Sequence, residues 1–269
     1  MTGFPPAPDP GPRTQTARVR PAPGGRGNIG GVTVITFAHR GARTLEPENT
    51  LAAFRRALAD GAAGLESDAW LSADGEVVLV HDPVVRRGLR RARVARSTAA
   101  ELQRFGVPRL ADLYEDCGAG YDLSVDLKDP QAAGPMVRLA RTHGAADRLW
   151  ICVGNRERLR SLRSEAPDVR LVHSPGRGKV VGTALERLAA DLAADGIDAL
   201  NLHHTDWTGG IVSLLHRFDL RAFAWDVQET RHILGMLRIG IDAIYCDRVD
   251  RMLAAVGEWS DAPGGRPPA

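Results

Sequence analysis

The 269-residue chain lacks long apolar runs, closely spaced cysteines and a large net charge. No stretch approaches the roughly 18 apolar residues that a membrane span requires, so no span is expected. Cys117, Cys152 and Cys246 are far apart and offer no CxxC pair, which favours reduced thiols in a cytoplasmic protein. A formal charge of +2 is too small to predict a polyanionic partner for the whole chain, and no nucleic acid is expected.

The two ends of the chain differ in composition from its middle. Residues 1–31 are rich in Pro, Gly and Arg and lack the apolar core of a signal peptide, so we expect a disordered tail. Residues 259–269 indicate a second tail in the same way. Residues 32–258 are predicted to form one folded domain, of a size that α/β barrels often have.

Apolar periodicity predicts alternating strands and helices in this domain. The predicted strands are Thr33–Ala38, Gly64–Trp70, Val77–His81, Asp122–Leu127, Leu149–Val153, Arg170–Ser174, Ala199–His203, Arg221–Asp226 and Ala243–Cys246. The predicted helices are Thr50–Asp60, Met136–His143, Arg156–Glu165, Thr183–Ala194, Gly210–Phe218 and Glu229–Ile239. Asn49-Thr50 is typical of a helix start, and Gly61 of a helix end.

Repeated strand–helix units predict parallel strands with right-handed crossovers. Only Leu71–Glu76 separates Gly64–Trp70 from Val77–His81, which leaves no room for a helix and indicates a hairpin extension. Eight strands then remain, so we predict an α/β fold, a single (β/α)8 barrel. An open doubly wound sheet is the alternative, but no GxGxxG turn follows the first strand.

Polar residues at the carboxyl ends of these strands are the candidates for an active site. His39 ends the first strand, although a lone histidine there can equally be a structural imidazole bonded to backbone. Glu66 and Asp68 are two apart on one strand, so their side chains share a face and repel each other. A hard divalent metal and a salt bridge to arginine both satisfy such a pair, and the pair alone does not choose between them.

The next barrel strand repeats this spacing with Asp126 and Lys128. Asp126 can supply a third oxygen to the same metal, and Lys128 a positive charge for an anionic substrate. His81, followed by Asp82, adds a second histidine. Two histidines flanking a metal suit in-line displacement at phosphorus, where one removes a proton from the nucleophile and the other protonates the leaving alkoxide.

Five motifs, in this order and spacing, resemble the glycerophosphodiester phosphodiesterase family. They are Ala38-His39-Arg40-Gly41, Pro47-Glu48-Asn49-Thr50-Leu51-Ala52-Ala53-Phe54, Gly64-Leu65-Glu66-Ser67-Asp68, Ser72-Ala73-Asp74-Gly75 and Val80-His81-Asp82-Pro83. Weaker agreement continues through Asp126-Leu127-Lys128, Trp225-Asp226-Val227 and the segment from Gly240 to Asp247. The resemblance covers about residues 33–255.

The resemblance implies a (β/α)8 barrel that hydrolyses small-molecule glycerophosphodiesters to an alcohol and glycerol 3-phosphate with Mg²⁺ or Ca²⁺. It implies that His39 and His81 are the general base and acid. It also implies that Glu66 and Asp68 are metal ligands and that Asp126 stands at the position of the third ligand.

The same resemblance implies that Arg40 and Lys128 hold phosphate oxygens. Trp225 would wall the glycerol or head-group side of the pocket, with a core aromatic as the alternative. Asn49 would fix the loop after the first strand or cap the helix rather than contact substrate. His203 and His204 follow a strand and either line the rim or lie on the surface.

Two departures from the family pattern keep other functions open. The family usually has Glu where Asp126 stands, and the insertion after His81-Asp82 is shortened to Pro83–Val107. A lysophospholipase D-like or lyase-like phosphodiesterase and a catalytically weak, phosphate-ester-binding barrel are the alternatives. The shortened segment contains a run of arginines, interpreted either as a solvated loop or as a surface at the barrel mouth that attracts phosphorylated or lipid head groups: Arg86, Arg87, Arg90, Arg91, Arg93 and Arg96.

Overall fold

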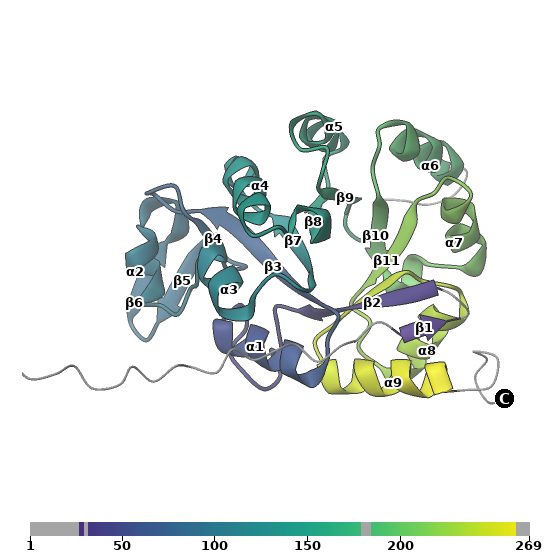
Figure 1. The fold of residues 1–269 in the computed structure, drawn as a ribbon, viewed down its shortest axis with the longest axis horizontal. Helices are drawn as coiled ribbons and strands as arrows, with labels where there is room; N and C mark the ends of the chain where they lie inside the picture. Colours follow the sequence, from purple (N-terminus) through teal and green to yellow (C-terminus); the bar gives the residue numbers. More distant parts are fainter. Residues whose placement is uncertain (1–26, 30–31, 179–183, 262–269) are drawn as a thin grey trace, which may run out of the picture.

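Eight parallel strands form a closed barrel in the computed structural model, which describes residues 27–29, 32–178 and 184–261. Each strand pairs with the next, and the last returns to the first. This confirms the predicted (β/α)8 fold (Figure 1). The barrel strands are β2 (Val32–His39), β3 (Gly64–Leu71), β7 (Asp122–Leu127), β8 (Leu149–Val153), β9 (Arg170–His173), β10 (Ala199–His203), β11 (Arg221–Trp225) and β12 (Ala243–Cys246).

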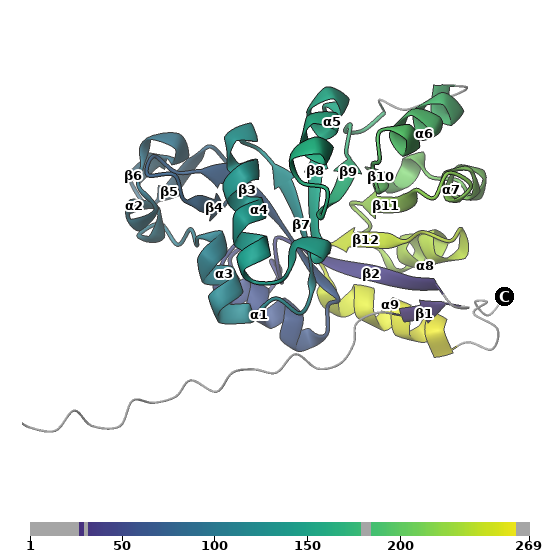
Figure 2. The ribbon, with the colours of Figure 1, turned by 45° about the horizontal axis from the view of Figure 1, so that its top comes forward.

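Helices surround the barrel strands (Figure 2). Six were predicted and are confirmed with small changes at their ends: α1 (Leu51–Asp60), α4 (Ala133–Thr142), α5 (Arg156–Glu165), α6 (Ala184–Ala194), α7 (Gly209–His216) and α8 (Thr230–Arg238). Three were not predicted: α2 (Ala99–Gln103), α3 (Leu110–Cys117) and α9 (Val249–Asp261). Short 3-10 turns are η1 (Val94–Arg96), η2 (Pro130–Ala132), η3 (Ala146–Arg148) and η4 (His204–Asp206). No helix in these described ranges is long and apolar enough to cross a membrane.

Local signals explain why α1 lies where it does. The Thr50 side chain accepts a hydrogen bond from the Ala53 backbone N–H, which satisfies one of the free donors at the helix start. Gly61 ends the helix in a left-handed conformation, with φ of 106°, that glycine adopts without strain. The helix start and end that the sequence indicated are therefore both confirmed.

A lobe of two hairpins extends from the end of β3. β4 (Val77–Leu79) pairs antiparallel with β3, which confirms the predicted hairpin extension, although the strand ends before His81. β5 (Val84–Arg87) and β6 (Arg90–Arg93) form a second hairpin. The arginine run therefore lies on this hairpin and on η1 rather than in a loop. The lobe has its own apolar core of Val78, Val85, Val94, Ala99, Leu102 and Val107.

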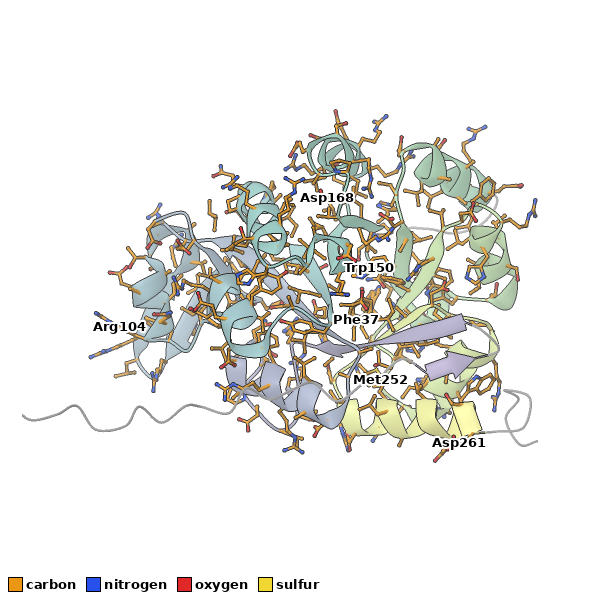
Figure 3. The ribbon with its side chains drawn as sticks, in the orientation of Figure 1. Phe37, Arg104, Trp150, Asp168, Met252 and Asp261 are labelled. Carbon is orange, nitrogen blue, oxygen red and sulfur yellow. The ribbon has the colours of Figure 1, made fainter. Side chains whose placement is uncertain are left out.

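Aromatic side chains fill the barrel interior. Phe37 stacks on Tyr245 with ring centroids 4.8 Å apart, and Trp150 packs on Phe223 at 5.0 Å. Phe37 and Trp150 lie near the centre of the molecule in Figure 3. Gly64 lets β3 approach this core, because a Cβ there would lie 2.6 Å from the Asp122 carbonyl oxygen and 2.7 Å from the Phe37 ring. That close approach sets the position of β3 and its acidic residues.

Both predicted tail boundaries overlap with regular structure. Gly27–Ile29 forms β1, which pairs antiparallel with β2, and α9 continues to Asp261. The folded part therefore extends beyond residues 32–258 at each end. Residues 1–26 and 262–269 of the predicted tails lie outside the described residues.

Candidate active site

A cavity of about 440 Å³ opens among residues at the carboxyl ends of the barrel strands. That is the end of the barrel where the sequence placed an active site. Five of the eight predicted site residues line it: His39, Arg40, Glu66, Asp126 and Trp225. Asp68 and Lys128 join this group through ion pairs, whereas His81 is not among the lining residues.

His39 is held by a carboxylate from the opposite end of the chain. Its Nδ1 lies 2.6 Å from Oδ1 of Asp247, to which it donates a hydrogen bond. The contact arises because β12 pairs with β2 in parallel, with Cys246 beside Ala38, so the residues that follow these partners meet. Burial lowers the pKa of His39, but the charge of Glu66 and the hydrogen bond to Asp247 outweigh it, so the pKa is raised. Asp247 was not predicted as a site residue.

Glu66 is buried and faces the other nitrogen of His39. Its Oε2 lies 3.7 Å from His39 Nε2 and accepts a hydrogen bond from the Arg40 backbone N–H at 3.0 Å. Burial and the charges of Asp68 and Asp126 together raise the pKa of Glu66 to about 8, against the opposing effect of His39. The buried position of Glu66 therefore disfavours its charged form, and the two neighbouring carboxylates add to this effect.

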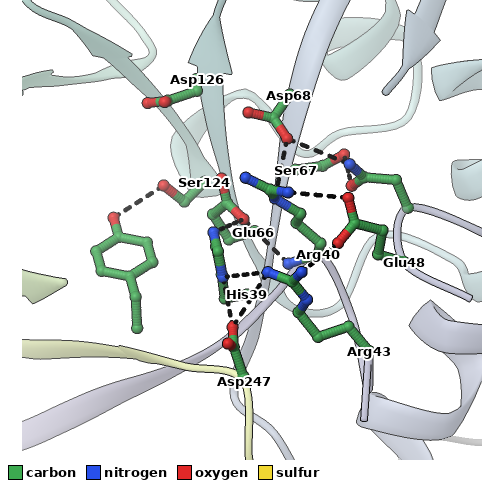
Figure 4. Close-up of polar contacts among 12 residues, drawn as sticks. His39, Arg40, Arg43, Glu48, Glu66, Ser67, Asp68, Ser124, Asp126 and Asp247 are labelled. Carbon is green, nitrogen blue, oxygen red and sulfur yellow. Dashed lines mark hydrogen bonds and ion pairs between the residues drawn. The ribbon is translucent and has the colours of Figure 1, made fainter. Parts of the chain in front are cut away.

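Asp68 has partners for both of its carboxylate oxygens. Lys128 Nζ lies 3.1 Å from Oδ1, and Arg40 Nε lies 3.5 Å from Oδ2. Asn49 Nδ2 donates to the same Oδ2 at 3.2 Å, while Asn49 Oδ1 accepts from the Ser67 hydroxyl at 2.7 Å (Figure 4). Asn49 thus ties the loop after β2 to β3. For Asp68, the structure shows the ion-pair arrangement that the sequence left open.

Lys128 lies between two of the predicted metal ligands. Asp68 and Asp126 are direct neighbours across the β3–β7 pair, and Lys128 Nζ lies 3.0 Å from Asp126 Oδ2 as well as 3.1 Å from Asp68 Oδ1. Burial lowers the pKa of Lys128, but the charges of both carboxylates raise it overall. The ammonium group is therefore held in its charged form at the edge of the site.

Two groups of side chains offer oxygen or nitrogen ligands to a cation. Glu66 and Asp68 lie on β3 and Asp126 beside them on β7 (Figure 4), but the possible ligand atoms of these three carboxylates do not all lie within 4.8 Å of one another. A second group is formed by His203, His204 and Asp226, whose possible ligand atoms lie within 4.8 Å of one another. It is the one group of three that meets this limit in the part of the chain that is described. Metal ligation by the carboxylates remains a prediction.

His81 lies just beyond the end of β4. Its side chain is 39% exposed, and its Nδ1 lies 2.7 Å from Oδ1 of Asp82. The His81 carbonyl accepts a hydrogen bond from Trp70 Nε1 at 3.3 Å, which fixes the backbone at this point. The structure therefore gives His81 a carboxylate partner but does not bring it into the cavity lining with His39, and its role as a general acid stays a prediction.

Trp225 lines the cavity, is partly exposed and also packs against the aromatic barrel core, so its role as a pocket wall stays a prediction. The ring of His203 meets it edge-on, with centroids 4.6 Å apart, and His203 Nε2 lies 3.2 Å from Asp226 Oδ2. His203 is buried and His204 half-buried, so the pair lies under the rim beside Trp225.

Other lining residues also escaped the sequence reasoning. Arg43 lies 3.6 Å from the Asp247 carboxylate, and the Ser124 and Tyr245 hydroxyls are 2.9 Å apart. Asp247 alone carried a usable signal, because it directly follows the last predicted strand, which must close on the first in an eightfold barrel. Ser124 and Tyr245 carried none, since a hydroxyl inside a strand has no distinguishing pattern.

Comparisons with known proteins agree with this architecture. Residues 39–251 match the sequence model of the glycerophosphoryl diester phosphodiesterase family. A glycerophosphodiester phosphodiesterase of Caldanaerobacter subterraneus subsp. tengcongensis is 24% identical over 246 residues, which cover 82% of this chain and 97% of the relative. Probable glycerophosphodiester phosphodiesterase 2 of Mycobacterium tuberculosis is 27% identical over 256 residues, with coverages of 85% and 94%.

Solved structures show the same fold. A putative glycerophosphoryl diester phosphodiesterase of Silicibacter pomeroyi superposes with a TM-score of 0.75 at 23% identity, covering 87% of this chain and 96% of that one. An Oleispira antarctica phosphodiesterase, solved in complex with the product sn-glycerol-3-phosphate, gives a TM-score of 0.70 at 23% identity, with coverages of 82% and 96%.

Proposed function

The chain belongs to the glycerophosphoryl diester phosphodiesterase family, and we propose that it hydrolyses glycerophosphodiesters to an alcohol and glycerol 3-phosphate. Relatives that carry the name of this activity match most of the chain, and the Oleispira antarctica relative was solved with sn-glycerol-3-phosphate. The observation that carries the proposal is the His39–Asp247 pair, which faces Glu66 in the cavity at the carboxyl ends of the strands.

His39 would act as the general base. Its Nδ1–H is held by Asp247, so Nε2 is the nitrogen available on the side of Glu66 and the cavity. It would take the proton from the attacking oxygen, which is either a glycerol hydroxyl or a water molecule. The first route gives a cyclic phosphate that is then hydrolysed, and both routes need the same base.

His81 would protonate the leaving alcohol, with Asp82 orienting its ring as Asp247 orients that of His39. Arg40 and Lys128 would hold the phosphate oxygens. Both cations contact Asp68, so they are positioned by one buried carboxylate. Trp225 would form the wall on the head-group side.

The donor set fits a hard divalent cation such as Mg²⁺ or Ca²⁺. Glu66 and Asp126 present carboxylate oxygens to the cavity, and burial together with the charges of Asp68 and Asp126 raises the pKa of Glu66. These two residues would hold the ion. Asp68 would be a third ligand if Lys128 left it to contact the phosphate. When bound, the cation would supply positive charge for the phosphate oxygens and for the transition state.

An assay with two substrates tests the proposal. Purified protein is incubated with glycerophosphocholine and with lysophosphatidylcholine, with and without a chelator, and glycerol 3-phosphate and choline are measured. We expect glycerol 3-phosphate from the first substrate, lost with the chelator and in His39→Ala but retained in His216→Gln, which alters a histidine on α7. Choline released from lysophosphatidylcholine alone would instead indicate the lysophospholipase D-like activity.

A catalytically weak, phosphate-ester-binding barrel is the second candidate, favoured by Lys128 occupying the space between Asp68 and Asp126. No turnover of either substrate, together with retained binding of glycerol 3-phosphate, would support it.

We also propose a cytoplasmic location, because Cys117, Cys152 and Cys246 are free thiols.

A further inference from the structure

Seven arginines gather on the lobe that extends from β3. They lie on the β5–β6 hairpin, on η1 and at the end of α2, and we call them the arginine surface: Arg86, Arg87, Arg90, Arg91, Arg93, Arg96 and Arg104. All seven are exposed, and none forms an ion pair with another residue that the structure describes. Elsewhere on the surface, arginines such as Arg56 and Arg141 do have carboxylate partners.

The register of the hairpin places like charges opposite each other. Arg86 is paired with Arg91, and Arg87 with Arg90. Like charges directly opposite in an antiparallel pair destabilise it. The hairpin is held instead by Val85 and its partner Ala92, which pack on the small core of the lobe. The arginines therefore oppose the fold locally, and an external anionic surface would relieve their repulsion.

A groove continues the arginine surface between the hairpin and α2. It has a volume of about 750 Å³, and six of the seven arginines line it together with Glu101. Glu101 is already engaged, because its carboxylate accepts a hydrogen bond from the Thr98 backbone N–H at 2.9 Å. The groove therefore presents guanidinium donors with little opposing charge, which suits phosphate groups.

The tip of the hairpin adds an apolar side chain. Gly88 and Leu89 form the turn, and Leu89 is fully exposed, with Leu45 as the other exposed large hydrophobic residue in the described ranges. An apolar tip flanked by arginines matches the composition of a bilayer interface, where the apolar residue enters the acyl boundary and the cations contact phosphates. A nucleic acid could bind the arginines through its phosphates, but it offers no apolar region for Leu89 to enter.

The lobe is placed so that it can meet a flat surface. Figures 1 and 2 both show β5, β6 and α2 at the outer end of β3, on the opposite side of the barrel from α6 and α7. We propose that the arginine surface docks the protein on an anionic phospholipid bilayer, with Leu89 inserted at the interface. This inference does not depend on the reaction proposed above.

Vesicle sedimentation tests the docking. The partition coefficient of the protein is measured on vesicles of phosphatidylcholine alone and of equal parts phosphatidylcholine and phosphatidylglycerol. We expect binding to the anionic vesicles only, weakening as salt is raised. Each arginine near an anionic surface adds about fivefold in partitioning, so Arg86→Ala/Arg91→Ala should bind roughly 25-fold more weakly. Leu89→Ser should bind several-fold more weakly while keeping the salt dependence.

A charge-matched variant and a fold control keep the test specific. Arg160→Ala/Arg238→Ala removes the same charge from α5 and α8, at exposed arginines outside the arginine surface, and should bind within about twofold of wild type. Thermal unfolding of each variant separates loss of docking from loss of fold, and Arg86→Ala/Arg91→Ala should unfold no earlier than wild type because it removes a repulsive pair.

Four outcomes of the vesicle experiments would overturn the proposal. They are equal binding to neutral vesicles, no binding to anionic vesicles, equal losses in the two double-arginine variants, and displacement from vesicles by inorganic phosphate at concentrations too low to screen charge. The last would assign the groove to soluble phosphate esters. Tighter binding to duplex DNA than to anionic vesicles at the same salt, unaffected by Leu89→Ser, would assign the surface to nucleic acid instead.

Discussion

Asp247 Oδ1 lies 2.6 Å from His39 Nδ1, although 208 positions separate the two residues in the chain. Asp247 follows the last barrel strand, which pairs with the first strand that ends in His39. The pairing that closes the barrel therefore also orients the proposed base. A carboxylate on Nδ1 fixes the tautomer and ring orientation of a histidine and leaves Nε2 to exchange protons.

Replacing Asp247 with Asn should impair catalysis while leaving the shape of the cavity unchanged. Asp247 raises the pKa of His39, so Asp247→Asn should lower that pKa. Because the base works unprotonated, the acidic limb of the kcat/KM profile should move to lower pH. The plateau should fall about 10²-fold or more, since the ring loses its orienting charge. A plateau at the wild-type level would contradict the role of Asp247, and Asp242→Asn, which alters a carboxylate paired with His216, is the matched control.

Removing Lys128 should distinguish the two possible cation sites. Lys128→Ala leaves Asp68 and Asp126 without their shared ammonium group, so a divalent cation at Glu66 and Asp126 should bind about tenfold more tightly. KM for glycerophosphocholine should rise, because a phosphate contact is lost. Isothermal titration with Ca²⁺ measures the first effect. Unchanged affinity in Lys128→Ala, with affinity lost in His204→Gln, would place the cation at His203, His204 and Asp226.

Enlarging Gly64 should destabilise the barrel where β3 meets its neighbours. A Cβ there would lie 2.6 Å from the Asp122 carbonyl oxygen and 2.7 Å from the Phe37 ring, so Gly64→Ala should lower the free energy of unfolding by about 1–3 kcal/mol. Activity should fall as well, because β3 holds Glu66. Gly235→Ala in α8 meets nothing within 4 Å and should stabilise by about 0.5–1 kcal/mol. Denaturant titration of both variants measures the difference, and equal stabilities would contradict this explanation.

Much of the barrel could be predicted because its signals are local. A buried parallel strand is visible in the sequence as a short apolar run. In a barrel, a polar residue at the carboxyl end of such a strand lies at the mouth of the barrel, independently of the other strands. Glu66 and Asp68 were placed on one face by their spacing alone, and the structure keeps them there. The ends of helix α1 were predicted from Asn49-Thr50 and Gly61 for the same reason, since capping depends on neighbours in the chain.

Elements were missed where the decisive interaction is not local. The strands of the β5–β6 hairpin carry five arginines in eight residues, so apolar alternation could not reveal them. The position of Lys128 between Asp68 and Asp126 depends on a side-chain conformation that no spacing rule specifies. The helix α2 was missed although Thr98 and Glu101 form a capping box, because it is only five residues long.

The buried charge of Glu66 should make stability depend on pH in a direction opposite to that of a salt-bridged acid. Burial raises its pKa from the usual 4.5 to about 8, so the folded protein binds more protons than the unfolded chain between these values. The free energy of unfolding should therefore fall as pH rises through this interval, in the presence of a chelator. Glu66→Gln should remove that fall and be more stable at about pH 8 by roughly 1–3 kcal/mol.

Cation binding should reverse this order of stability. Mg²⁺ or Ca²⁺ binds the ionised carboxylate, so saturating cation should stabilise the wild type at about pH 8 and release protons on binding. Glu66→Gln should show neither effect, whereas Glu157→Gln, at an exposed position on α5, should behave as wild type. Denaturant titrations over pH, with chelator and with cation, measure both effects. A different result would contradict the proposed cation site. If the free energy of unfolding in chelator rises from pH 5 to 8, and Glu66→Gln abolishes that rise, the Glu66 carboxylate already has a balancing partner.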